Sequence, residues 1–200
     1  MGVHQHARGY LVRQVLLFHG SLLFLSGFVA MDTKIDIFWA GTLHAKALTH
    51  AFGIIVLMLV SIPLQWRFLT DERKRRALHT LPQQPRELGW WLVISIGAGV
   101  AEELTYRGVM FALLFRLIGA WWPAALICAL VFAVVHINQG LTSVTIVGLF
   151  SIGMQWLVLA TGSLYLAIAV HVVYDFLAGI VYVNLAKGVS LTPLTVEQTP

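Results

Sequence analysis

Three charged residues interrupt an otherwise apolar run at residues 99–115, GVAEELTYRGVMFALLF. A charge at bilayer depth costs between about 3 and 15 kcal/mol, so such residues normally pair, face water or serve a function. Glu103 and Arg107 stand four residues apart with the acid first, the favourable order for an ion pair on a helix. Glu102 is turned about 100° from Glu103 on a helix. We therefore expect Glu102 to face a different environment and to be the candidate for acid–base chemistry.

Further ionisable residues follow in the same apolar half. Between residues 88 and 185, the charged residues and histidines are Glu102, Glu103, Arg107, Arg116, His136, His171 and Asp175. His171 and Asp175 are four residues apart and share a helix face. If residues 101–118 and 122–138 form an antiparallel hairpin, Glu102 and His136 both lie about 24–27 Å from its turn. We therefore expect Glu102 and His136 to lie level with each other, whereas His171 lies only about 13 Å from a turn near residue 162 and fits this level less well.

A glutamate combined with two histidines suits two kinds of hydrolysis. In the first, the carboxylate takes a proton from water while polar donors stabilise the oxyanion. In the second, Glu102, His136 and His171 hold a zinc ion in a three-ligand catalytic site. The residues alone leave this choice open. The sequence contains neither a G-x-S-x-G elbow nor an H-E-x-x-H motif, so it carries no sign of those hydrolase classes.

The composition is that of a polytopic membrane protein. Of the 200 residues, 58% are hydrophobic and 11% are charged, whereas soluble domains carry roughly 25% charge. A span needs roughly 20 apolar residues. The sequence therefore predicts an all-α transmembrane bundle of about six helices, over residues 10–30, 45–66, 88–117, 122–138, 144–160 and 163–184. The third is too long for one straight span, so we expect it to be tilted or broken near residues 97–99, which leaves open six spans or five spans and a re-entrant piece.

The chain divides into four segments by charge and hydropathy. Residues 1–66 hold the N-terminal membrane helices, 67–87 a basic cytoplasmic loop, 88–185 the core with the polar residues, and 186–200 a C-terminal tail. Residues 67–86 carry six Lys or Arg against two acids, and the positive-inside rule places this loop and the N-terminus in the cytoplasm. The loop is short and lacks interleaved aromatic residues, so we expect no nucleic-acid partner.

Three motifs in the apolar half resemble those of the CPBP family of intramembrane proteases. The segments EELTYR (102–107), FAVVH (132–136) and HVVYD (171–175) stand in the order of the family's E-E-x-x-x-R, F-x-x-x-H and H-x-x-x-N/D. The family includes the CAAX prenyl-protein endopeptidases and bacterial Abi-type and lysostaphin-resistance-type proteins. The resemblance covers residues 88–185, about half of the chain, and makes this segment a CPBP-like protease core.

The resemblance implies a helical membrane fold whose polar residues converge in a cavity open to the cytosol or membrane, and it implies a role for each motif residue. By this likeness Glu102 is the general base that activates water, and His136 helps to hold that water. His171 and Asp175 lie on the oxyanion side. The supporting residues are Glu103 and Arg107. The likeness favours glutamate-dependent hydrolysis without a cofactor, with zinc bound by Glu102, His136 and His171 as the alternative.

Asp175 departs from the prenyl-processing branch of that family, which has Asn at this position. An ionised aspartate cannot donate a hydrogen bond to an oxyanion. Asp175 must therefore be protonated, or act by orienting His171. Prenylated CAAX substrates do not follow from the resemblance alone.

The sequence predicts an intramembrane endopeptidase of a bacterial or archaeal cell membrane, in contact with lipid. Its substrate is expected to be a membrane-anchored or membrane-emerging protein or peptide. The alternative is a non-catalytic immunity or scaffold protein that keeps the polar cluster for structure. A transporter or proton relay would use the same charges, but the sequence lacks paired interrupted helices in two matching halves.

Overall fold

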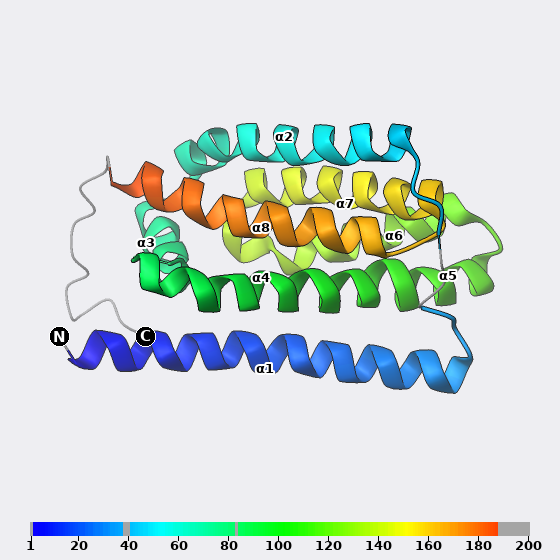
Figure 1. Cartoon of the computed structure of the whole chain (residues 1–200), viewed down its shortest axis with the longest axis horizontal. Coiled ribbons are helices and arrows are strands. Elements are labelled where there is room, and N and C mark those ends of the chain that lie inside the picture. The colour runs from blue at the N-terminus through cyan, green and yellow to red at the C-terminus, as the bar shows by residue number, and fades with distance from the viewer. Residues whose placement is uncertain (1, 38–40, 83, 188–200) are drawn as a thin grey trace.

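The computed structural model describes residues 2–37, 41–82 and 84–187, which form helices and no strand (Figure 1). The predicted all-α class is confirmed. The elements are α1 (Gly2–Thr33), α2 (Ala45–Phe68), α3 (Asp71–Thr80), a 3-10 turn η1 (Pro85–Glu87), α4 (Leu88–Glu103), a π-helical segment η2 (Leu104–Met110), α5 (Phe111–Ile118), α6 (Trp121–Val135), a 3-10 turn η3 (Ile137–Gln139), α7 (Leu141–Thr161) and α8 (Tyr165–Ala186).

The helices have the length and the exterior of membrane spans. Four in the described part of the chain are long and apolar enough to cross a bilayer: Val12–Thr33, α2, α7 and α8. Helix α6 is apolar but shorter, and α4, η2 and α5 follow one another without a gap. Large apolar side chains such as Phe24, Leu57 and Leu149 point outwards and are 73%, 70% and 66% exposed. Lipid can cover such a surface, so the chain is an integral membrane protein.

The long third span is not broken at residues 97–99. Helix α4 continues through these residues to Glu103, and the irregular winding begins only after it, in η2. There the backbone N–H of Phe111 bonds to the carbonyl oxygen of Tyr106, five residues back. This spacing is that of a π-helix, a rare form that occurs often at functional sites. Of the two alternatives expected for this span, the break is wrong.

Residues 67–87 contain a helix, α3, where the sequence predicted a loop. The hydroxyl of Thr70 caps this helix by accepting a hydrogen bond from the backbone N–H of Arg73. Asp71 and Glu72 occupy its first turn, where negative charge is favoured by the helix dipole. These signals stabilise a short basic helix within the connection between α2 and α4.

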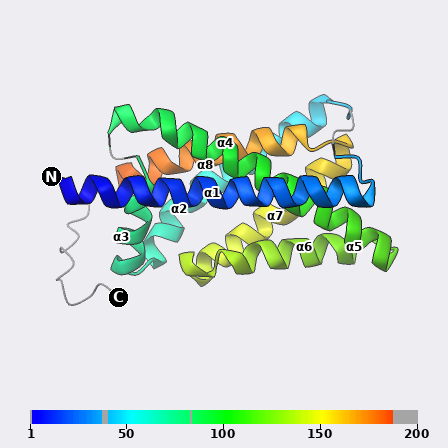
Figure 2. The same cartoon turned by 90° about the horizontal axis from the view of Figure 1, so that it is seen from below.

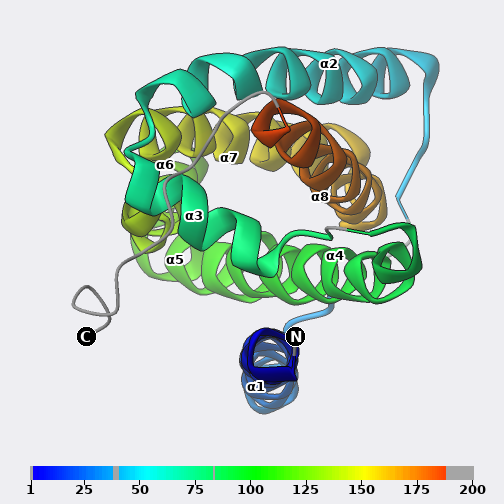
Figure 3. The same ribbon diagram turned by 90° about the vertical axis from the view of Figure 1, so that its left-hand side faces the viewer.

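The helices surround an interior that α3 borders at one end. Figure 3 looks along the bundle and shows α2, α8, α4 and the α6–α7 pair arranged around this interior, with α3 at one side of its near end. Helix α4 packs against α8, α2 packs against α8 and α7, and α6 packs against α7.

Helix α1 lies outside this arrangement. It runs along the length of the molecule on the outer side of α4 (Figures 2 and 3), and only 11% of its most apolar window is buried. At its C-terminal end, Arg116 of α5 donates a hydrogen bond of 2.7 Å to the carbonyl oxygen of Thr33. A cation at the last carbonyls of a helix satisfies groups that have no partner within that helix.

The close approach of α4 and α8 depends on Gly99. A Cβ atom at this position would lie 2.6 Å from Cγ2 of Val172 and 3.2 Å from its backbone nitrogen. We expect Gly99→Ala to push the two helices apart and to lower the free energy of unfolding by about 1–3 kcal/mol, as overpacking does elsewhere. Unfolding in detergent micelles measures this change. The matched control is Gly89→Ala in the same helix, where a Cβ meets nothing within 4 Å; equal stability of the two variants would contradict the expectation.

Candidate active site

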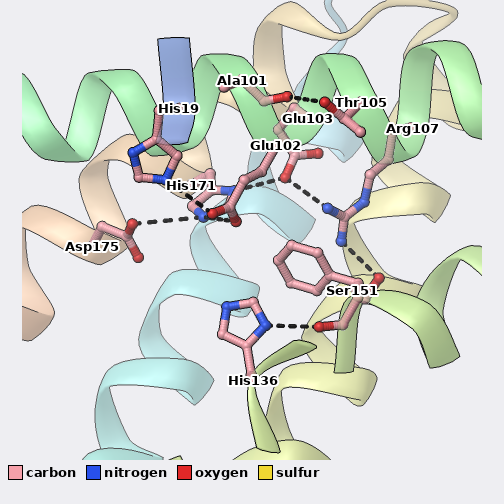
Figure 4. Close-up of polar contacts among 11 residues, drawn as sticks. His19, Ala101, Glu102, Glu103, Thr105, Arg107, His136, Ser151, His171 and Asp175 are labelled. Atoms are coloured by element: carbon pink, nitrogen blue, oxygen red, sulfur yellow. Dashed lines mark hydrogen bonds and ion pairs between the residues drawn. The ribbon is translucent and has the colours of Figure 1, made fainter. Parts of the chain in front are cut away.

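Glu102 stands near the end of α4, where its carboxylate meets histidines from two other helices (Figure 4). Its Oε1 lies 3.2 Å from Nε2 of His19 on α1. Its Oε2 lies 3.8 Å from Nε2 of His171 on α8. Among the described residues, no Lys or Arg forms an ion pair with this carboxylate. The structure therefore places Glu102 between imidazoles and leaves it without a permanent positive partner.

The ion pair predicted between Glu103 and Arg107 is present and buried. Nη1 of Arg107 donates to Oε1 of Glu103 at 3.0 Å, and the two side chains are 1% and 0% exposed. The guanidinium also donates through Nη2 to Oγ of Ser151 at 2.7 Å, and it lies 4.4 Å from the ring centre of Phe132. The pair thus connects η2 to both α6 and α7, which the sequence did not predict.

His171 is oriented by Glu103. Its Nδ1 lies 2.7 Å from Oε1 of Glu103, and because a carboxylate only accepts hydrogen bonds, Nδ1 carries a proton. Its Nε2 is turned towards the other two carboxylates, 3.8 Å from Glu102 and 3.6 Å from Asp175. A separation of 3.6 Å is too long for a hydrogen bond. Glu103 therefore makes the hydrogen bond that orients His171, while Asp175 lies near Nε2 of the same ring without a hydrogen bond to it.

His136 follows the last residue of α6 and projects towards Glu102 from the opposite side of the site (Figure 4). Its Nδ1 lies 2.7 Å from the carbonyl oxygen of Phe132. A carbonyl only accepts, so Nδ1 donates this bond and the ring is held by its own helix. In the neutral imidazole, Nε2 then remains as an acceptor for a hydrogen bond from a group in the cavity.

These side chains line one cavity of about 450 Å³. Its polar members from the three motifs and from α1 are His19, Glu102, His136, His171 and Asp175. The same cavity extends to Gln65, Tyr182 and, on α3, to Arg73 and Arg76. The predicted polar cavity is therefore present, and it runs from Glu102 to the α3 end of the bundle.

His19 is the site residue that sequence reasoning missed. It is 8% exposed and belongs to α1, 83 residues before Glu102. A histidine inside an apolar span is rare enough to be a functional hypothesis, and this signal was present in the sequence. The spacing along the chain gave no sign of its partner, because that contact depends on how α1 packs against α4.

The donors expected for zinc do not converge as metal ligands. A catalytic zinc needs three protein atoms within about 2.0–2.2 Å of one point. Within residues 2–37, 41–82 and 84–187, no group of three His, Cys, Asp or Glu side chains is placed to hold a metal ion. Nδ1 of His136 is bonded to the backbone and Nδ1 of His171 to Glu103, so Nε2 is the nitrogen of each ring that could bind a metal. Zinc bound by Glu102, His136 and His171 therefore stays a prediction, as the alternative to the metal-free mechanism.

Comparison with known families gives one match. Residues 84–177 match the family model described as Type II CAAX prenyl endopeptidase Rce1-like. No curated protein and no solved structure gives a significant match to the chain. The matched segment contains all three motifs and their four candidate catalytic residues, whereas His19 precedes it. Residues 84–177 of this membrane protein are therefore Rce1-like, similar in sequence to the type II CAAX prenyl endopeptidases.

Proposed function

We propose that this protein is an intramembrane endopeptidase in which Glu102 activates water to hydrolyse a peptide bond. The observation that supports this most is the contrast between two adjacent carboxylates. Glu103 is neutralised by the buried guanidinium of Arg107. Glu102 faces the cavity and contacts only imidazoles among the charged partners described. A cavity-facing carboxylate without a fixed cation is suited to accept and return a proton.

We propose the following reaction, which the positions of the cavity residues support. A water between Glu102 and His136 loses a proton to the Glu102 carboxylate, and its oxygen attacks the peptide carbonyl carbon. Negative charge then develops on the carbonyl oxygen, which we place on the side of His171 and Asp175, where a protonated Nε2 of His171 donates to it. Glu102 returns the proton to the departing nitrogen, so that the C–N bond breaks and a carboxylic acid and an amine leave, and the acid then loses its proton to the amine.

The substrate reaches Glu102 from the α3 end of the cavity. We propose that α3 and the N-terminus face the cytoplasm, because α3 holds most of the cationic residues of the 67–86 segment and cytoplasmic connections are enriched in such residues. The cavity combines apolar lining residues such as Met58 and Phe150 with the polar cluster. This suits a peptide that is held in the membrane by an apolar anchor while its backbone enters the site.

Hydrolysis of defined probe peptides in isotopically labelled water tests the proposed function. The full chain is reconstituted in lipid vesicles with a prenylated peptide ending in a CAAX sequence, the same peptide without the prenyl group, or a peptide with a membrane-spanning anchor. We expect one or more probes to yield two fragments, with ¹⁸O from H₂¹⁸O in the newly formed carboxylate, as mass spectrometry detects. If ¹⁸O enters the peptide fragments only when the vesicles contain the protein, the protein is a hydrolase. Intact probes in all three reactions would favour the non-catalytic scaffold or immunity protein.

Metal analysis of the active preparation distinguishes the metal-free mechanism from the zinc-dependent one. The proposed metal-free mechanism predicts that hydrolysis continues after dialysis against a chelator, with far less than one zinc ion per chain. One zinc per chain, with activity that is lost to the chelator and restored by zinc, would support zinc bound by Glu102, His136 and His171.

A further inference from the structure

The first helix contributes a histidine to a cluster whose other ionisable members, Glu102, His136, His171 and Asp175, lie within the Rce1-like segment. Helix α1 ends at Thr33, well before the matched residues 84–177 begin. Most of its surface is exposed to the surroundings of the bundle. Yet His19, halfway along α1, is buried, lines the cavity and contacts Glu102. This contact requires an explanation beyond the family motifs.

The polar contact of His19 is directed at the carboxylate alone. Nε2 lies 3.2 Å from Oε1 of Glu102, and since the carboxylate accepts, Nε2 is the donor. The second nitrogen, Nδ1, is buried without a hydrogen-bond partner among the described residues. On that side α4 carries Gly97, where a Cβ would lie 4.0 Å from Nδ1. A buried imidazole that bonds through one nitrogen only is well placed to orient one group.

Helix α1 is attached to the bundle by other contacts. Nearer its C-terminal end, Oγ of Ser26 lies 2.7 Å from Oγ1 of Thr105 in η2. Beyond it, Ala30 and Ile35 pack with Val109 of η2 in a separate apolar cluster. Docking of α1 therefore has its own polar and apolar contacts, two turns and more away from His19.

We infer that His19 is a positioning residue for hydrolysis at Glu102. By donating to Oε1, it fixes the plane of the carboxylate so that Oε2 faces His171 and the water in the cavity. Without this bond the carboxylate rotates about its side-chain torsions, and the proton-accepting oxygen is no longer held in line with the water. This inference rests on the proposed function, in which Glu102 is the base.

Two replacements at position 19 test this role, because their amide nitrogens lie at different distances from the backbone. The amide nitrogen of Gln lies close to the place of Nε2 in histidine, whereas that of Asn lies close to the place of Nδ1. We expect His19→Asn to lower kcat by about 10- to 100-fold, the range that misplacement of a catalytic group by about 1 Å produces, with KM unchanged. We expect His19→Gln to restore kcat to within about threefold of the natural chain. Ser26→Ala is the control for docking of α1 and should leave kcat unchanged.

Measurements of kcat, KM and unfolding temperature on these variants and on Glu102→Gln separate the possible outcomes. Equal kcat for His19→Asn and the natural chain, with Glu102→Gln inactive, overturns the role of His19 alone. Hydrolysis by Glu102→Gln overturns the proposed function itself. A fall in kcat for Ser26→Ala as large as that for His19→Asn assigns the effect to docking and overturns positioning. A lower kcat for His19→Asn and a restored kcat for His19→Gln, at similar unfolding temperatures, support the positioning role of His19.

Discussion

Replacing Glu102 by glutamine is expected to lower the rate of hydrolysis by about 10²- to 10⁴-fold, the contribution that a general base typically makes. The amide has the shape of the carboxylate and its oxygen can still accept the hydrogen bond from His19. It cannot take a proton from water. The change therefore removes the chemistry and keeps the packing, so kcat of the cleaved probe should fall while the unfolding temperature remains close to that of the natural chain.

The control for this variant is Glu72→Gln on α3. It makes the same chemical change at an exposed carboxylate, whose partner is Arg76 of the same helix. We expect this variant to hydrolyse the probe at the natural rate. If Glu102→Gln kept more than a tenth of the natural rate, the base would have to be another group, and the assignment of Glu102 would be wrong.

Replacing Arg107 by methionine is expected to lower the free energy of unfolding by about 3–5 kcal/mol, the usual effect of removing one member of a buried ion pair. Methionine fills much of the space, but it leaves the Glu103 carboxylate buried without its cation and the Ser151 hydroxyl without its donor. Unfolding in detergent micelles, followed by circular dichroism or by accessibility of Cys128, measures the loss.

A matched pair elsewhere in the chain supplies the control for Arg107. Arg76 and Glu72 have the same four-residue spacing, but their side chains are 67% and 59% exposed. Solvent screens such a pair, so Arg76→Met should change stability by about 0–1 kcal/mol. Equal losses in Arg76→Met and Arg107→Met would mean that burial does not decide the importance of the ion pair in this protein.

Much of the fold could be predicted because lipid restricts what a chain can do. A span must be helical and about 20 residues long, so the predicted 45–66 and 163–184 correspond closely to α2 and α8. The π-helical segment could not be predicted in the same way. Its residues, LTYRGVM, are compatible with an ordinary helix, and the wider winding appears only where this span packs against α1 and α6. Helix α3 was not predicted, because a segment with so many charged residues has the composition of a solvated loop.

The contacts of the site that lie within one helix could be predicted from the sequence. The spacing of Glu103 and Arg107 was sufficient to predict their ion pair, which is confirmed. Contacts between helices were not predictable from spacing. Glu103 bonds to His171 across 68 residues, and Arg107 bonds to Ser151 across 44. The role of Asp175 remains a prediction, because its carboxylate lies near His171 without a hydrogen bond to it.

The winding of η2 also determines how related chains can differ in length. A single π-helical turn holds one residue more than an α-helical turn would. In regular α-helical winding, one added residue would rotate α5 by about 100° relative to α4, whereas the π-helical turn takes up that residue. Deleting one residue between positions 104 and 110 would therefore return the span to regular winding and leave α5 on the same face. Arg116 would then keep its contact with the carbonyl oxygen of Thr33. Related chains can thus differ by one residue in this segment while the glutamates before it and the α1 contact after it keep their places.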